Sequence, residues 1–184
     1  MSKVAITGNA SGTGVFTVAS PNSNTDRVLT LPDESGTVLT TEGVPTAAMP
    51  AGSIIQVVSS ESTAAFSTSS TSYVATTHTA TITPSSTSSK ILIIYSGLWS
   101  IQAANTQVDV IARSSLGATN LGISTFYSAT SSGFTNSTQN FAYLHSPSST
   151  SALTYTIHAK EAGAAGTVST GTDLKTLTLM EIAG

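Results

Sequence analysis

The chain has 184 residues, of which only 8% are charged, and 6 Lys and Arg stand against 9 Asp and Glu, so the net charge is −3. Because nucleic-acid binding needs many cations to neutralise phosphates, this charge excludes a nucleic-acid-binding protein. No apolar run approaches the roughly 20 residues of a membrane span, and the absence of Cys excludes disulfides and thiolate metal sites.

Hydroxyl side chains dominate the sequence, with 31 Ser and 32 Thr making up about a third of it. Thr and other β-branched residues fit a pleated surface, whereas the strong helix formers Leu, Lys, Glu, Arg and Met are sparse. The composition therefore predicts an all-β protein whose surface is covered by Ser, Thr, Asn and Gly rather than by ions.

The first 45 residues read as short strands separated by turns that are rich in Pro, Asn, Asp, Ser and Gly. We expect strands at 14–18, 27–31 and 37–40. A segment of this length seldom buries enough apolar surface to fold alone. Val15 and Val28 therefore need cover, and further copies of the same chain supply it most simply. The sequence predicts a short intertwined β-shaft over 1–45, shared between copies of the chain.

A linker over 46–52 follows, with Pro and Gly and no period-2 pattern. Beyond it, 53–184 is long enough for one domain. We expect strands at 53–59, 72–83, 90–100, 107–113, 120–127, 139–145, 153–159 and 174–182, with loops at 84–89 and 146–151. So many short strands predict an antiparallel β-sandwich, jelly-roll-like, as a head domain.

The run from Thr7 through Gly8 and Gly12 to Gly14 resembles the glycine-rich start of short-chain dehydrogenases, which cradles a dinucleotide against a helix. The residues that follow predict a strand and a turn rather than that helix. Tyr155 and Lys160 are also five apart, where that family has a spacing of four. We therefore expect no cofactor.

The remaining chemistry-bearing residues are few. His78, His145 and His158 show no metal-ligand spacing, although a metal site could assemble across strands from His145, His158 and Asp109. No Gly-x-Ser-x-Gly elbow is present. The adjacent charges Lys160 and Glu161 are expected to form a local solvated pair. We predict that the protein is not an enzyme and has no catalytic, cofactor-binding or metal-binding residues.

Aromatic residues give the candidate contact site. Trp99, the single Trp, is expected in the core. Phe134 stands in the middle of a polar loop predicted over 128–138. An exposed ring can stack on a sugar while nearby polar groups bind its hydroxyls, so Phe134, Asn136 and Tyr127 are possible receptor contacts. The alternative is that Phe134 folds back onto the sandwich.

Several stretches resemble one protein family. The segments 11–22, 27–33 and 35–41 look like the shaft of tailed-bacteriophage fibre proteins, and 49–58, 82–93 and 177–184 are similar to the fibre heads of aquatic phages. The resemblance implies a parallel homotrimer on the surface of the virion, made in the host cytoplasm. It carries over no catalytic residues. Long fibres have a large N-terminal anchor, whereas here the shaft starts close to Met1, as in a short fibre, a tip on another protein, or a capsid fibre.

The expected function is a trimeric phage fibre whose head contacts the host surface, with a cell-surface glycan as ligand, and whose N-terminal segment binds other virion proteins. Neither nucleic acid nor a membrane is an expected partner. One alternative is a capsid-bound head fibre or decoration protein without a receptor role. A lesser alternative is a carbohydrate-active enzyme.

Overall fold

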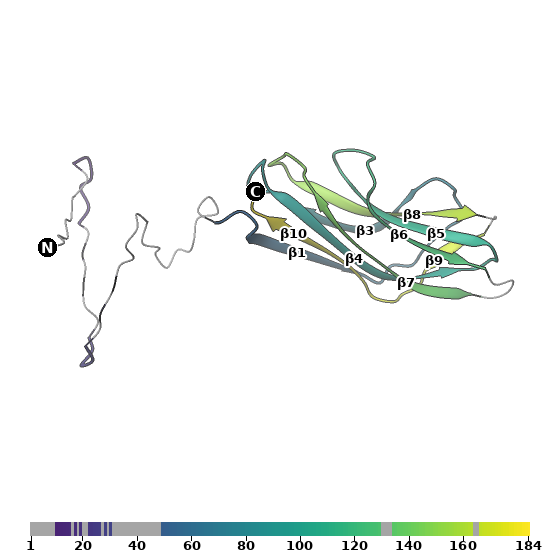
Figure 1. Cartoon of the computed structure of the whole chain (residues 1–184), viewed down its shortest axis with the longest axis horizontal. Helices are drawn as coiled ribbons and strands as arrows, with labels where there is room; N and C mark the ends of the chain where they lie inside the picture. Colours follow the sequence, from purple (N-terminus) through teal and green to yellow (C-terminus); the bar gives the residue numbers. More distant parts are fainter. Residues whose placement is uncertain are drawn as a thin grey trace. The chain divides into compact units, whose positions relative to one another are not determined.

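The computed structural model describes residues 10–15, 17, 19, 22–26, 28, 30, 49–129, 134–163 and 166–184. The chain divides into two compact units, residues 1–38 and residues 39–184. Every strand of the described residues lies in the second unit (Figure 1). We call its folded part, residues 53–184, the head.

The described residues of the first unit form neither strand nor helix in the single chain. Val15 is 91% exposed and Val28 is 92% exposed, so the described residues of their own unit cover neither side chain. Two of the expected shaft strands, 14–18 and 27–31, are described only in part, and the third, 37–40, lies outside the described residues, as do positions 46–48 of the linker. The shaft therefore stays a prediction about the assembled protein.

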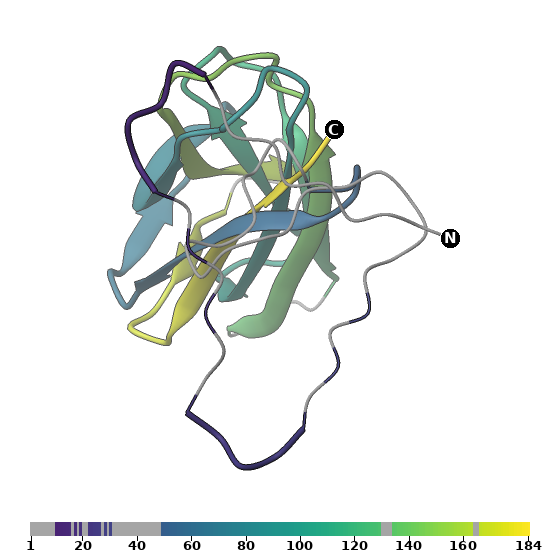
Figure 2. The same cartoon turned by 90° about the vertical axis from the view of Figure 1, so that its left-hand side faces the viewer.

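The head is an antiparallel β-sandwich, and Figures 1 and 2 show its two layers. Sheet A contains β1 (Ile54–Ser62), β2 (Phe66–Thr68), β4 (Lys90–Ile101), β7 (Thr135–His145), β9 (Val168–Thr170) and β10 (Lys175–Ile182). Sheet B contains β3 (Val74–Ile82), β5 (Thr106–Ser114), β6 (Leu121–Ser128) and β8 (Leu153–Gly163). The prediction of an all-β sandwich is confirmed.

The long strands of sheet A lie in the order β1-β10-β4-β7. On the side of β4 where β10 pairs with its first part, the short β9 pairs with its last residues, and β2 pairs with β9. Sheet B has the order β3-β8-β5-β6. Strands that follow one another along the chain mostly lie in opposite sheets, and the first strand pairs with the last. This connectivity is that of a jelly roll. It makes β1 and β7 the two edges of the long part of sheet A.

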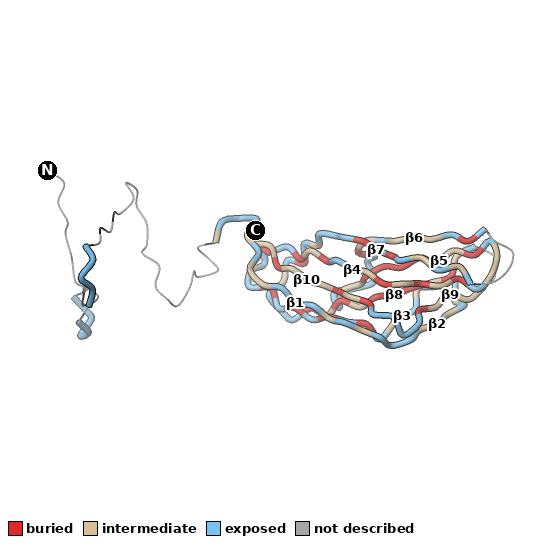
Figure 3. Tube along the Cα trace, turned by 90° about the horizontal axis from the view of Figure 1, so that it is seen from below, coloured by how far each residue is buried: buried red, intermediate tan, exposed pale blue. Residues whose placement is uncertain are grey.

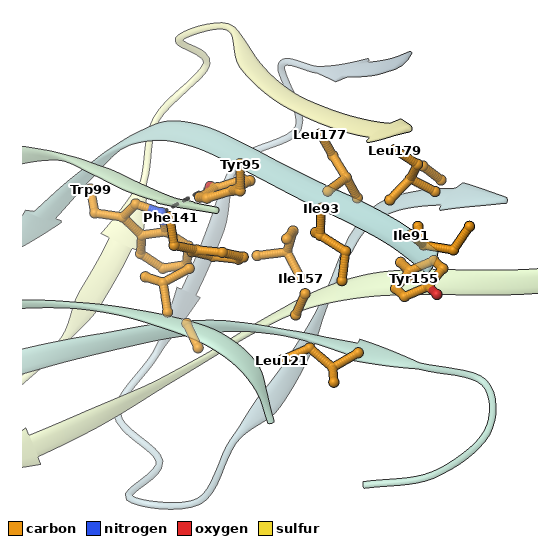
Figure 4. Close-up of a cluster of buried hydrophobic side chains, with 14 of the residues drawn as sticks. Ile91, Ile93, Tyr95, Trp99, Leu121, Phe141, Tyr155, Ile157, Leu177 and Leu179 are labelled. Carbon is orange, nitrogen blue, oxygen red and sulfur yellow. Dashed lines mark hydrogen bonds between the residues drawn. The ribbon is translucent and has the colours of Figure 1, made fainter. Parts of the chain in front are cut away.

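Period-2 alternation builds the core, because successive side chains of a strand point to opposite faces of its sheet. Figure 3 shows buried and exposed residues alternating along the strands, and Figure 4 shows the inward side chains meeting between the sheets. The largest fully buried side chains include Ile91, Ile93, Tyr95, Trp99 and Ile101 of β4, Leu153, Tyr155 and Ile157 of β8, and Leu177 of β10. The expected core position of Trp99 is confirmed.

All eight expected head strands are present, with ends shifted by a few residues. Two three-residue strands, β2 and β9, were not expected. The predicted loop 128–138 is wrong in part, because β7 already begins at Thr135, where it pairs with Ile101 of β4.

The two ends of the head differ in what they carry. The chain enters beside its own C-terminus, where the amide of Gly52 donates to the carbonyl of Ala183 at 2.8 Å and the amide of Ala183 donates to that of Ser53 at 2.8 Å. We call this the linker end. β4, β6 and β8 end, and β5, β7 and β9 begin, at the opposite, far end (Figure 1). None of the described residues forms a helix long and apolar enough to cross a membrane.

Candidate functional site

The three predicted contact residues all reach solvent at the far end of the head. Phe134, just before β7, is 69% exposed, and Tyr127 on β6 is 51% exposed. Asn136, the second residue of β7, is also exposed. The alternative in which Phe134 folds back onto the sandwich is therefore wrong for the single chain.

The fold does not bring these three side chains onto one surface. Tyr127 pairs with Gln107 of β5, beside the core-facing Val108, so both point to the outer face of sheet B. Asn136 pairs with Ser100 of β4, between the core-facing Trp99 and Ile101, so it points to the outer face of sheet A. Phe134 directly precedes β7, at the far-end start of that strand. One flat surface of the head therefore does not carry both Tyr127 and Asn136.

Hydrogen bonds hold this end of the head in place. The hydroxyl of Tyr127 donates to Oδ1 of Asn105 at 2.8 Å. Asn105 lies in the β4–β5 turn with a φ of 55°, a left-handed conformation that Asn tolerates better than most residues. The hydroxyls of Ser128 and Thr135 are 2.9 Å apart and join the end of β6 to the start of β7. Tyr127 is thus positioned by the turn beside it.

A second polar surface occupies the outer face of sheet B around Asp109. Oδ1 of this carboxylate accepts hydrogen bonds from Gln107 Nε2 at 2.7 Å and Thr125 Oγ1 at 3.1 Å. Its Oδ2 lies 3.4 Å from Nζ of Lys160, which is paired with it across β5 and β8. Asp109 is therefore largely buried on the outer face of its sheet, and its charge is fully engaged.

Tyr73 lies next to this network under two cations. The guanidinium of Arg113 is 5.2 Å from its ring centroid, and Nζ of Lys160 is 5.0 Å away. Burial raises the pKa of Tyr73, as does the charge of Asp109, and Arg113 opposes them, so the hydroxyl is neutral at physiological pH. Arg113 also donates from Nε and Nη2 to Oδ1 of Asn120, at 3.2 and 3.1 Å. The guanidinium is thus held from two sides.

Arg113 borders an open hollow of about 490 Å³, which hydroxyls of Ser115, Thr154 and Thr156 and the ring of His158 also line. The single ion pair among the described residues joins Lys160 to Asp109, so Arg113 has no carboxylate partner there. Burial lowers the pKa of His158, and so does the charge of Arg113, whereas the hydrogen bond to the Thr156 carbonyl raises it. The net shift is downward, so the imidazole is neutral near pH 7. A guanidinium held in place among hydroxyls can pair with the carboxylate of an acidic sugar, while the protein hydroxyls form hydrogen bonds to the hydroxyl groups of that sugar.

The residues considered for a metal site each have other partners. Nδ1 of His145 lies 2.9 Å from the Tyr155 hydroxyl, and Nδ1 of His158 lies 3.1 Å from the Thr156 carbonyl. Within the part of the chain that the structure describes, no group of three His, Cys, Asp or Glu could hold a metal ion. The described positions after Gly14 are not helical either, as the dinucleotide motif would require.

The expected local pair of Lys160 and Glu161 is wrong. Adjacent residues of a strand point to opposite faces, so Lys160 reaches Asp109 outside the sheet while Glu161 is buried on the core side. Sequence reasoning also missed Tyr73 and the hollow beside Arg113. Positions 73, 113 and 158 meet only through strand register, and no local pattern in the sequence indicates that register.

Comparison with known proteins adds no identity. The chain matches no known protein-family model and no curated protein sequence.

Proposed function

We propose that the protein is a structural appendage of a bacteriophage virion, a homotrimeric fibre whose N-terminal segment forms a shared β-shaft and whose head contacts the host surface. The resemblance of residues 11–41 to fibre shafts is the reason for proposing this family. The β-sandwich head is the kind of domain that such a fibre would carry at its end.

One observation carries the proposal furthest. Val15 and Val28, which belong to the expected shaft strands, are more than 90% exposed in the single chain. Burying a valine contributes about 1.5–3 kcal/mol, so a segment that leaves such residues in water gains stability when copies of it pack together. A three-fold shaft gives each valine that cover.

The head would supply weak contacts that three-fold valency multiplies. Its outer surface offers two regions with chemistry for a saccharide: the exposed ring of Phe134 at the far end, and the hollow beside Arg113 on sheet B. The ring would stack on a sugar face, and the guanidinium would pair with a carboxylate or sulfate of an acidic glycan.

The first test is the mass of the full-length protein by analytical ultracentrifugation. We expect three times the chain mass of 18.6 kDa. A single-chain mass at micromolar concentration would overturn the proposal.

The second test measures adsorption of the purified protein to cells of the bacterium that the phage infects. Phe134→Ala and Arg113→Gln are expected to weaken adsorption while leaving the mass unchanged. Leu174→Ala removes an exposed apolar side chain of the β9–β10 turn and serves as the control. If all three variants form trimers that adsorb as well as the wild type, the result contradicts the receptor role and favours the decoration-protein alternative.

A further inference from the structure

An unbroken apolar row crosses the outer face of sheet A. Strand register aligns Val57 of β1 with Met180 of β10, Met180 with Leu92 of β4, and Leu92 with Leu144 of β7. Met180 and Leu92 alternate with buried neighbours, and Val57 and Leu144 are aligned with them across the strands, so all four point away from the sandwich interior. Four strands thus present one line of apolar side chains to the outside.

The row is open to solvent in the single chain, particularly at its two ends. Val57 is 54% exposed and Leu144 is 48% exposed, and they lie on the two edge strands. The next row toward the far end retains Ile94 and Ala142, and both are exposed. Apolar surface of this kind on a soluble protein marks an interaction site when it is contiguous.

The apolar surface is confined to one part of the face. Two rows from Val57 toward the far end, the aligned residues are Glu61, Thr176, Ser96 and Asn140, which are all polar. Toward the linker end, the exposed Ile54 pairs with Ile182, which keeps the β1 and β10 part of the face apolar, and the charged Lys90 of β4 follows in the same row. The patch therefore adjoins the point at which the chain enters the head.

The outer face of sheet B is different. It carries the ion pair of Lys160 and Asp109 and the guanidinium of Arg113, with hydroxyls around them. One outer face of the sandwich is therefore suited to water and polar ligands, and the other to an apolar partner.

The position of the linker indicates what that partner is. Hydrogen bonds of Gly52 and Ser53 to Ala183 fix the chain's entrance at the linker end, and Val57 follows Ser53 by four residues, about 13 Å of strand. If three chains run together before residue 49, as the proposed function requires, their β1 strands begin close to the shared axis. The face of β1 that carries Val57 then adjoins the other copies.

We infer that the row of Val57, Met180, Leu92 and Leu144 is the contact between heads of the trimer, with two further copies of this chain as its occupants. The inference rests on the proposed trimer. A closed ring of three needs a surface that meets a different surface of the next copy. The edge strands supply both, so that the Leu144 side of one head packs against the Val57 side of its neighbour.

Charge substitutions in the full-length protein test the contact. Leu144→Lys and Val57→Lys change side chains that are about half exposed in the single chain, so the head should still fold. Each is expected to raise the concentration at which the trimer dissociates by about tenfold or more. Ile123→Lys, at an equally exposed apolar position of β6 on sheet B, is the matched control and should leave it unchanged.

A cross-link gives a local readout in case the shaft alone holds the trimer. The chain has no Cys, so a Val57→Cys/Leu144→Cys double variant carries the only thiols. Three strand spacings, about 14 Å, separate the two positions within one head, which is beyond the roughly 7 Å limit for a disulfide. Mild oxidation is therefore expected to give covalent trimers on a denaturing gel, and an Ile123→Cys variant is not.

The outcomes separate the two proposals. A wild-type trimer that is weakened by neither Lys variant, and that forms no covalent species, overturns this interface and leaves the fibre proposal standing. A wild-type protein that sediments as a single chain overturns both this interface and the fibre proposal.

Discussion

Trp99 Nε1 donates a hydrogen bond of 3.0 Å to the hydroxyl of Tyr95, four positions earlier on the same strand. Both side chains are buried, and Figure 4 shows the bond within the core. Gly97 lies between them on the same face of β4, and its missing side chain leaves the space that the Tyr95 hydroxyl occupies. Burial raises the pKa of Tyr95 to about 12, so the phenol is neutral throughout the physiological range.

Tyr95→Phe should destabilise the head by about 1–3 kcal/mol, because it leaves the indole N–H of Trp99 buried without an acceptor. Urea unfolding at a fixed protein concentration measures the change. Tyr127→Phe is the control, since the Tyr127 hydroxyl binds Asn105 at the surface, where water can replace it. Equal losses in the two variants would contradict the role given to the buried bond.

Gly97→Ala should also destabilise the head, because an added Cβ would overlap the Tyr95 hydroxyl and lie 2.9 Å from Cγ of Lys175. Overpacking of this kind costs about 1–3 kcal/mol. Combining it with Tyr95→Phe removes the overlapping oxygen, so the double variant should lose less stability than the sum of the two single variants. Strictly additive losses in urea unfolding would show that the clash is relieved elsewhere.

The sequence indicated the strands of the head well where alternation is long. β4, β8 and β10 alternate buried and more exposed positions over at least eight residues, and most of the buried positions carry Ile, Leu, Tyr or Trp. β2 and β9 have three residues each, too few to show a period. The first residues of β7, Thr135 to Thr138, have the composition of a loop and are a strand only because β4 supplies backbone partners.

The candidate sites were harder to predict for the same reason. Phe134 stands out locally as an aromatic residue among hydroxyls, and the structure places it in solvent. Tyr127 and Asn136 point to opposite faces because of their positions in β6 and β7. The sequence predicts a loop at residue 135, where β7 begins, and so does not indicate this difference. The row from Val57 to Leu144 depends on three registers between strands distant in sequence.

The head should lose stability as the pH falls below about 6.5, the ordinary pKa of His. Burial lowers the pKa of His78, as does the charge of Lys175, while a 3.1 Å hydrogen bond from Nε2 to the Ser60 carbonyl opposes them. Burial lowers the pKa values of His145 and His158 as well. The unfolded chain thus binds protons at a pH where the folded head does not, which favours unfolding on acidification.

His78→Gln should reduce the dependence of the head's stability on pH, because it removes one of the three histidines whose pKa is lowered in the folded state. Melting temperatures of the variant and the wild type at pH 7 and pH 5, at one protein concentration, measure the effect. The drop between the two pH values should be smaller in the variant. A drop of unchanged size would mean that His78 does not contribute.

Glu181 gives a separate acid response at lower pH. Its Oε1 accepts from the amide and the hydroxyl of Ser85, both at 2.7 Å, and its Oε2 accepts from Gln56 Nε2 at 2.5 Å. Burial would raise the pKa of Glu181, but these hydrogen bonds outweigh it and hold the pKa below its ordinary value. The stability gained is present above the ordinary Glu value of about 4.3 and is lost as the pH falls through the folded-state pKa.

Glu181→Gln should therefore cost about 1–3 kcal/mol at pH 7, because the charged acceptor that joins β10 to β1 and to the β3–β4 loop is lost. At pH 3, which is below the ordinary Glu pKa of about 4.3, part of this stability is lost, so the difference between the two proteins should be smaller than at pH 7. Urea unfolding at both pH values measures it. Glu61→Gln, at an exposed position of β1, should change little at either pH, and a Glu181 variant that behaves the same way would refute the assignment.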